Sequence, residues 1–173
     1  MELSHSLSPL LEFLETWFIV GLLLLELATK IALNPAHQLS IVRDHGTYED
    51  LSERTRSASL SVASLVLAGL AVILREQNQN LTQQVEVFAG AFGLLLIAAF
   101  AHELTRTYRV VLTFQELSFE YGLLLLVYGL FLLVEKMVPG ASDVMFVVFV
   151  VVLLFRFMSV IGEVQAHKGE FKN

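Results

Sequence analysis

Five long apolar runs constrain what this chain can fold into more than any other feature of its sequence. They cover about residues 10–33, 57–74, 85–104, 117–135 and 143–162. A helix needs about 20 largely apolar residues to cross the hydrocarbon core of a bilayer, and it satisfies its own backbone hydrogen bonds there. The runs therefore predict an all-α, polytopic integral membrane helix bundle with five transmembrane helices. Four spans, with one middle run lying along the membrane surface, are the second choice.

The composition supports a membrane protein and excludes several other classes. Hydrophobic residues make up 55% of the 173-residue chain and charged residues 16%, whereas soluble domains are about a quarter charged. A net charge of -6 gives no reason to expect nucleic-acid binding. The absence of cysteine excludes disulfides, thiolate metal sites and cysteine nucleophiles. We expect residues 1–173 to form a single transmembrane domain.

Lysine and arginine are concentrated in alternate connecting segments, which sets the expected orientation. Cytoplasmic loops of membrane proteins carry an excess of these residues. One set of alternate segments holds two of them, Arg75 and Lys136. The other set holds eight: Lys30, Arg43, Arg54, Arg56, Arg106, Arg109, Lys168 and Lys172. We therefore expect a multi-pass protein of the cell membrane, with its N-terminus outside and its C-terminus in the cytoplasm.

The first run carries four ionisable residues on one narrow face. Glu12, Glu15, Glu26 and Lys30 fall within an arc of roughly 60° on a helical projection. Ionisable groups at membrane depth are costly and usually face the bundle interior, a cavity or a partner. This face is a candidate pathway for ions or protons. For Glu12 and Glu15 the alternative is that both lie at the outer interface, where water solvates them.

Arg156 is the matching charge inside the fifth run, and it suggests a bridge between the first and last helices. In the five-span arrangement Arg156 and Glu26 lie at similar depth, so we expect them to pair. Pairing of Glu26 with Lys30, one turn away, is the local alternative. For Arg156 the alternatives are snorkelling toward the interface and a polar seam with Glu163 on its own helix. If the bridge forms, swapping both charges should restore the assembly that either single swap loses.

The second and third runs are rich in small residues, which allow helix backbones to approach closely in lipid. We expect these two spans to form the tightly packed centre of the bundle. The small residues of the second run share one side, and those of the third run recur along it. They are Ser57, Ser61, Ser64, Ala68 and Ala71 in the second run, and Gly90, Gly93, Ala98 and Ala101 in the third.

The stretch 102–120 joins the third run to the fourth and contains no glycine, proline or asparagine. Its polar residues recur every three or four positions, as on one helix face, yet the fourth span must re-enter the membrane near residue 117. We expect the third helix to extend beyond the bilayer and the chain to reverse near Thr113–Leu117. Basic and acidic groups would then face each other at a cytoplasmic mouth made of His102, Arg106, Arg109, Glu116 and Glu120.

The segment 34–56 is the only sizeable polar connection, and we expect it to be a cytoplasmic loop. Residues 47–56 can form a short helix capped by Thr47. This loop is the predicted surface for a cytosolic partner, through Arg43, Asp44, His45, Arg54 and Arg56. Its histidines match no metal-ligand spacing, and the chain holds no recognisable catalytic or phosphate-binding motif, so we expect no metal, no cofactor and no enzymatic activity.

Two functions from different classes are consistent with these features. One is a small oligomeric channel for ions or protons, because carboxylate rings in a pore favour cations. The alternative is a non-catalytic membrane sensor or anchor subunit that recruits a cytosolic protein through loop 34–56 and the C-terminal tail. The expected partners are the lipid bilayer, further copies of the chain and a cytosolic protein, without nucleic acid.

Overall fold

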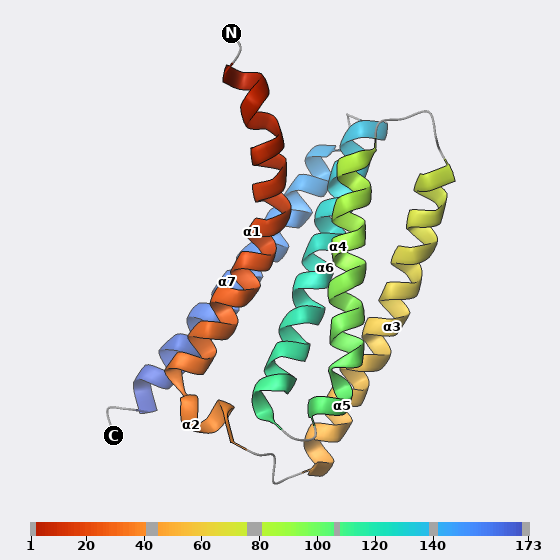
Figure 1. The fold of residues 1–173 in the computed structure, drawn as a ribbon. Helices are drawn as coiled ribbons and strands as arrows, with labels where there is room; N and C mark the ends of the chain where they lie inside the picture. The colour runs from red at the N-terminus through yellow and green to blue at the C-terminus, as the bar shows by residue number, and fades with distance from the viewer. Residues whose placement is uncertain (1–2, 41–44, 76–80, 106–107, 139–141, 171–173) are drawn as a thin grey trace.

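The chain folds into long helices that alternate in direction (Figure 1). The computed structural model describes residues 3–40, 45–75, 81–105, 108–138 and 142–170, and within these ranges it contains helices and no strand. The long helices are α1 (Leu3–Leu33), α3 (His45–Arg75), α4 (Thr82–Phe100), α6 (Arg109–Met137) and α7 (Ser142–Glu170). Two single-turn helices, α2 (Pro35–Gln38) and α5 (His102–Thr105), lie in the connections at one end of the bundle. The all-α expectation is confirmed.

Three helices are long and apolar enough to cross a membrane: α3 over Tyr48–Arg75, α4 and α6. Helix α4 is the shortest of the three, and its 19 residues give a length of about 28 Å, close to the thickness of a hydrocarbon core. Helix α7 contains a shorter apolar stretch, Phe146–Met158. The structure therefore supports a membrane location through three helices.

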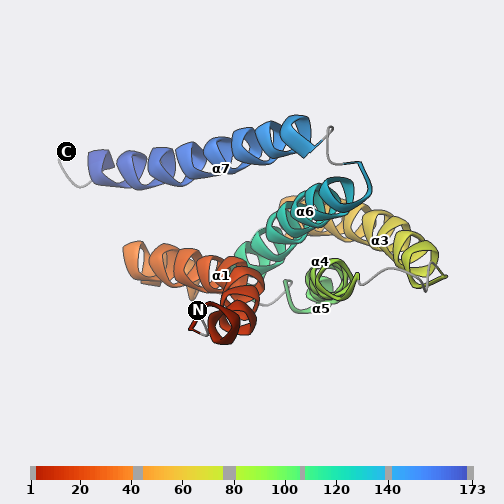
Figure 2. The ribbon, with the colours of Figure 1, turned by 90° about the horizontal axis from the view of Figure 1, so that it is seen from above.

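The packed core is built by α3, α4 and α6, with α4 contacting both of the others. Helix α3 contributes a buried stripe with heptad-like spacing, formed by Ser59, Ala63, Val66, Leu70 and Ile73. On its other side, α6 is approached by α1 and α7, and Figure 2 shows α6 lying between α7 and α4. Helix α6 is therefore the element through which the outer helices join the core.

Two glycines on α6 allow α4 to pack closely against it. A Cβ atom added at Gly122 would lie 3.0 Å from Cγ of Leu95. One added at Gly129 would lie 3.3 Å from side-chain atoms of Val87 and Phe88. These two positions, seven residues apart on one face, explain why α4 and α6 form the most extensive contact in the bundle.

The small residues of the second run do not face α4 within the chain. All five small residues named for that run are exposed on the outer side of α3: Ser57, Ser61, Ser64, Ala68 and Ala71. The larger residues on the other face of α3 bury more apolar surface, and they turn that face toward α4. In α4 the expected small residue Ala98 is buried, and Ala101 is buried directly after the helix.

The expected reversal near Thr113–Leu117 was wrong, because the chain turns earlier. Helix α4 ends at Phe100, α5 follows after Ala101, and Tyr108 has an extended backbone immediately before α6 begins at Arg109. Thr113–Leu117 lies inside α6, where Leu112, Gln115 and Leu117 are buried. These side chains are buried on different sides of α6, which has neighbouring helices on both sides, and this burial favours continued helix over a turn at this point.

The segment 34–56 is largely helical and is not an open loop. Helix α3 begins at His45, so the short helix expected over 47–56 is continuous with the second span. Residues 47–68 contain no glycine, proline or asparagine, which explains the continuity. The start of α3 therefore projects beyond the apolar part of the helix as a rigid extension.

Candidate functional site

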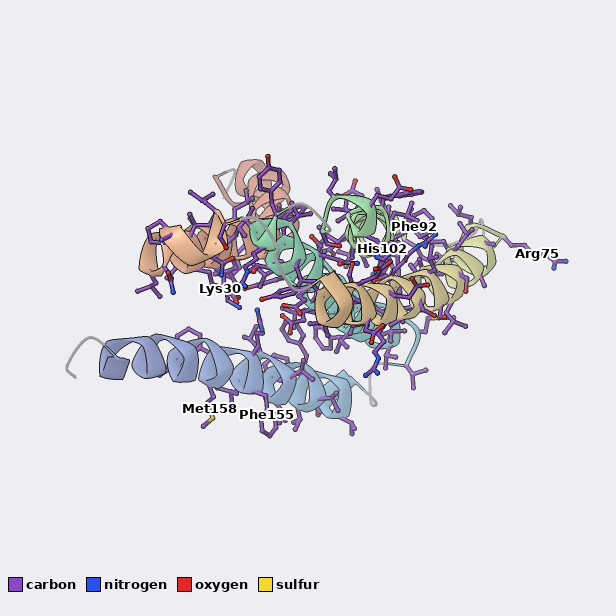
Figure 3. All side chains as sticks on the ribbon, turned by 90° about the horizontal axis from the view of Figure 1, so that it is seen from below. Lys30, Arg75, Phe92, His102, Phe155 and Met158 are labelled. Atoms are coloured by element: carbon purple, nitrogen blue, oxygen red, sulfur yellow. The ribbon has the colours of Figure 1, made fainter. Side chains whose placement is uncertain are left out.

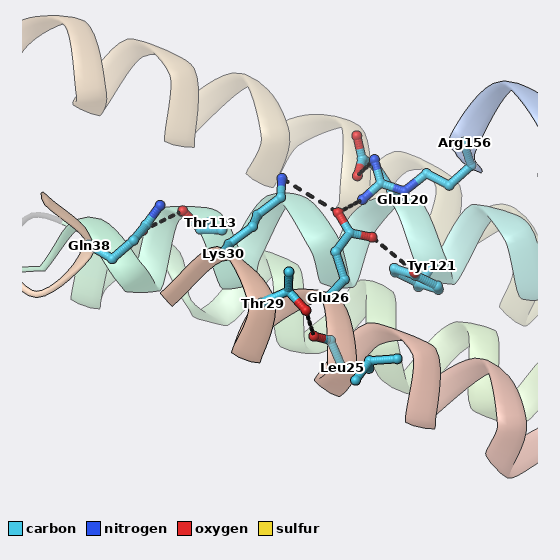
Figure 4. A network of polar contacts seen from close by, with 9 residues as sticks. All are labelled: Leu25, Glu26, Thr29, Lys30, Gln38, Thr113, Glu120, Tyr121 and Arg156. Atoms are coloured by element: carbon cyan, nitrogen blue, oxygen red, sulfur yellow. Dashed lines mark hydrogen bonds and ion pairs between the residues drawn. The ribbon is translucent and has the colours of Figure 1, made fainter. Parts of the chain in front are cut away.

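Five polar residues from three helices meet on one side of α6 (Figure 4). Helix α1 supplies Glu26 and Lys30, helix α6 supplies Glu120 and Tyr121, and helix α7 supplies Arg156. We call this group the ion cluster. Glu26 is the buried centre of it, with 6% of its surface exposed.

Both carboxylate oxygens of Glu26 are engaged. The Tyr121 hydroxyl donates a hydrogen bond to Oε2 at 2.9 Å. The Arg156 guanidinium donates to Oε1 through Nη2, and Lys30 Nζ lies 3.5 Å from the same oxygen. A carboxylate with these three partners is held in one position and is shielded from water.

Arg156 links two carboxylates at the same time. Its Nη1 lies 2.7 Å from Oε2 of Glu120, while Nη2 contacts Glu26. The guanidinium carbon also lies 5.5 Å from the centre of the Tyr121 ring, which is a cation–π distance. The planar guanidinium fork suits such a bridging role better than a lysine ammonium would.

The expected pairing of Glu26 with Arg156 is confirmed, and the local pairing with Lys30 is present as well. From the sequence alone these pairings are alternatives, because a sequence does not show that one carboxylate can serve both cations. Tyr121 was missed, since a tyrosine in an apolar run carries no charge pattern. Glu120 was assigned to the cytoplasmic mouth, but it belongs to the ion cluster.

A second polar group is buried where α3, α5 and α6 meet. We call it the Ser52 cluster, and it comprises Ser52, His102, Thr105 and Gln115, with each residue at most 5% exposed. Ser52 Oγ lies 2.8 Å from His102 Nδ1, 2.8 Å from Thr105 Oγ1 and 2.7 Å from Gln115 Oε1. Figure 3 shows His102 between the helices at this end. The cluster fixes the short α5 turn against the core.

The Gln115 amide determines the direction of the hydrogen bonds that Ser52 makes with Gln115 and His102. Gln115 Nε2 donates to the Ser52 carbonyl at 3.1 Å, so Oε1 is the atom that faces the Ser52 hydroxyl. The single hydroxyl proton of Ser52 is thereby committed to Gln115, while the Thr105 hydroxyl has two acceptors within reach, the His102 carbonyl and Ser52 Oγ. His102 Nδ1 must then donate to Ser52, which leaves Nε2 facing Glu53 Oε2 at 3.7 Å.

Ser52, His102 and Glu53 superficially resemble a nucleophile, a base and an acid. In that arrangement the serine would have to donate its proton to histidine, whereas here it accepts one. Ser52 is also fully buried in the middle of a helix turn. The geometry therefore supports a structural role for this group, in which buried polar atoms are satisfied by one another.

Two other residues predicted for the mouth, Arg109 and Glu116, lie on α6 and are not part of the Ser52 cluster with His102. The Arg109 guanidinium carbon lies 5.0 Å from the centre of the Tyr48 ring, and Glu116 is half-buried on α6. Arg109 and Glu116 lie two turns apart on one helix, so basic and acidic halves do not face each other across a turn. Arg106 lies outside the described residues.

The residues predicted for the partner loop and for the outer part of the acidic face are described only in part. Arg54 and Arg56 are exposed on the first turns of α3. Arg43 and Asp44 lie outside the described residues, and the side chains of Glu12, Glu15, His45 and Glu163 lie outside them as well. Among the residues that the structure does describe, no group of three or more His, Asp or Glu is placed to hold a metal ion.

Removing the hydroxyl of Ser52 should destabilise the fold much more than removing another serine hydroxyl from the same helix. In Ser52→Ala, the Gln115 oxygen and the His102 N–H lose their buried partner, at a cost of about 1–3 kcal/mol. Ser61→Ala is the matched control, because Ser61 is exposed and bonds only within its own helix. Unfolding by denaturant in detergent micelles, followed by circular dichroism, measures both. Equal stability of the two variants would contradict the assigned bonds.

The contacts of the ion cluster change the expected result of exchanging the charges at positions 26 and 156. An arginine at position 26 would meet Lys30, and a glutamate at position 156 would meet Glu120, so the double swap should not restore stability. Arg156→Gln alone should cost up to about 3–5 kcal/mol, because the buried Glu26 carboxylate loses its nearest cation and keeps only the contact with Lys30 at 3.5 Å and the Tyr121 hydroxyl. The neutral double variant, Glu26→Gln with Arg156→Gln, should lose less than the sum of its singles. The same unfolding measurement applies, with Arg75→Gln as an exposed control; additive losses would refute the coupling.

These two clusters are the guide to function, because comparison with known proteins adds nothing to them. Protein-family models, curated proteins and solved structures were all compared with the chain, and none of them matches it.

Proposed function

We propose that the chain is a non-catalytic membrane sensor or anchor subunit that recruits a cytosolic protein through one end of its bundle. The observation that carries the proposal is the state of Glu26. Its two carboxylate oxygens bind groups from α1, α6 and α7, so Glu26 joins three helices. A residue that lines a conduction pathway would instead present its carboxylate to water.

The proposed topology has five spans, with the N-terminus outside. Two features support it: α1 and α7 each contain one of the five apolar runs, and the long helices alternate in direction (Figure 1). In this topology the end that holds α2, α5 and the start of α3 faces the cytoplasm, where the excess of lysine and arginine belongs. The ion cluster would then lie within the membrane on its cytoplasmic side.

The proposed partner surface lies at this end of the bundle. Four apolar side chains there are between 42% and 63% exposed, namely Leu39, Leu51, Leu104 and Tyr108. They accompany the exposed charged residues Asp50, Glu53, Arg54 and Arg56. Exposed apolar side chains surrounded by charged ones are typical of protein-binding surfaces. We call this set the polar-end surface.

The polar-end surface is held firmly against α6. Thr113 donates a hydrogen bond to Gln38 at 3.0 Å, the Arg109 backbone N–H donates to the Ser40 carbonyl at 3.4 Å, and Arg109 lies over Tyr48. Helix α6 carries both these contacts and Glu120 and Tyr121 of the ion cluster. A shift of α1 or α7 within the bilayer therefore has a direct mechanical route, along one helix, to the proposed binding surface.

An oligomeric channel stays the second proposal, and it sets a specific requirement. Glu26 would have to be released from Lys30, Tyr121 and Arg156 before its carboxylate could meet an ion. That release exposes Arg156, a cation, in the same place. Assembly of several copies is compatible with either function, because α3 and α7 both keep exposed apolar faces.

One paired experiment separates the two functions. Liposomes containing the purified chain should show no cation or proton flux above empty liposomes, and Glu26→Gln should leave this unchanged. In membranes of the source cell, cross-linking should capture one cytosolic protein on the wild-type chain. Leu51→Glu with Leu104→Glu should abolish this capture, whereas Arg75→Gln at the opposite end should retain it. Flux that Glu26→Gln abolishes, or capture that survives the double variant, would overturn the proposal.

A further inference from the structure

We infer that the cavity between α6 and α7 binds one acyl chain of a zwitterionic bilayer phospholipid. The inference rests on the membrane location of α6 and does not depend on recruitment of a cytosolic partner.

Helix α7 touches α6 at two separate places. At one, Phe149 packs on Tyr128 with ring centres 5.4 Å apart, and Phe146 packs on Phe131 at 5.8 Å. At the other, Arg156 binds Glu120 and contacts Tyr121. Val152 lies between these two attachment points along α7. The helices are thus joined at both ends of a short interval and held apart within it.

A cavity of about 500 Å³ fills this interval. Its walls are apolar, formed by Leu123, Leu124 and Val127 on α6 and by Val152 on α7, and its polar end is formed by Glu120, Tyr121 and Arg156. Ligand sites typically measure roughly 300–1,000 Å³ and combine apolar walls with a few polar groups. The cavity has both properties.

The position of the cavity determines which ligand reaches it. It runs along α6, one of the helices apolar and long enough to cross a membrane, so the acyl chains of the surrounding lipid lie at its depth. The neighbouring surface of α7 is apolar as well, and Figure 3 shows Phe155 and Met158 pointing away from the bundle. Leaving an apolar space of this size empty forfeits dispersion contacts, which an acyl chain from the surrounding lipid restores.

The charge at the polar end determines the head group. The two carboxylates, Glu26 and Glu120, balance the two cations, Lys30 and Arg156, so the ion cluster has no net formal charge to attract an anionic head. The Glu120 side chain is 45% exposed and offers a carboxylate to an ammonium group, while Arg156 beside it offers N–H donors to a phosphate. A phospholipid that carries both groups fits this arrangement.

The test counts the phospholipids that stay bound to the full-length chain. Protein purified in mild detergent and washed free of loose lipid should retain about one phospholipid per chain by native mass spectrometry. Val152→Phe fills the cavity and should lower this occupancy at least fivefold, and Val127→Phe from the opposite wall should do the same. Leu154→Phe is the matched control, because Leu154 lies on α7 but does not line the cavity, and it should retain the lipid.

Several outcomes would overturn the inference. If the washed wild-type chain retains no phospholipid, the lipid site is excluded, and no variant is needed to show it. Retention that is equal in Val152→Phe and Leu154→Phe places the lipid elsewhere, provided circular dichroism shows both variants folded. When the delipidated chain is offered phosphatidylethanolamine, phosphatidylglycerol and free fatty acid together, it should rebind phosphatidylethanolamine. Preferential binding of phosphatidylglycerol or of the fatty acid would reject a zwitterionic lipid as the ligand. If the wild-type chain is a dimer and Val152→Phe makes it a monomer, the cavity is occupied by a second copy of the chain and not by lipid.

Discussion

The buried carboxylate of Glu26 is the constraint on which the arrangement of the outer helices depends. A charge taken out of water carries a large desolvation cost, and it is tolerated only when partners and hydrogen bonds compensate for it. Here the compensation comes from a hydroxyl on α6, a guanidinium on α7 and an ammonium on α1 itself. Each of these helices is therefore needed where it lies, because moving any one of them would remove at least one of the groups that compensate the buried charges.

Helix α6 connects this joint to the rest of the molecule. Its glycine face allows α4 to approach closely, its Gln115 completes the Ser52 cluster with α3 and α5, and its first turns hold α2. Apolar packing alone would permit these helices to slide past one another, whereas directional hydrogen bonds fix their register. The two polar clusters thus have complementary effects: one orders the cytoplasmic end of the proposed topology, and the other attaches the helices at the periphery.

Sequence reasoning predicted the helices better than the contacts between them. Long apolar runs are a local property, so the helical class and the approximate positions of the helices were correct. The depth of charges within those runs was sufficient to pair Glu26 with Arg156. The reversal at 101–108 was missed because nothing in that stretch breaks a helix, and the Ser52 cluster was missed because serine, threonine and glutamine carry no charge pattern. Which face of α3 is buried depended on competition between faces, which a single sequence does not resolve.

The distance between α7 and the core, measured with and without Arg156, shows whether the ion cluster holds α7 in place. The chain has no cysteine, so Leu154→Cys on α7 and Leu65→Cys on α3 can carry the only two spin labels in the protein. In lipid nanodiscs, pulsed electron spin resonance should give one narrow distance distribution, and Arg156→Gln should broaden it. A control pair within the core, Leu65→Cys with Ile97→Cys, should be unaffected. An α7 distance that is equally narrow without Arg156 would contradict the claim that the ion cluster holds this helix in place.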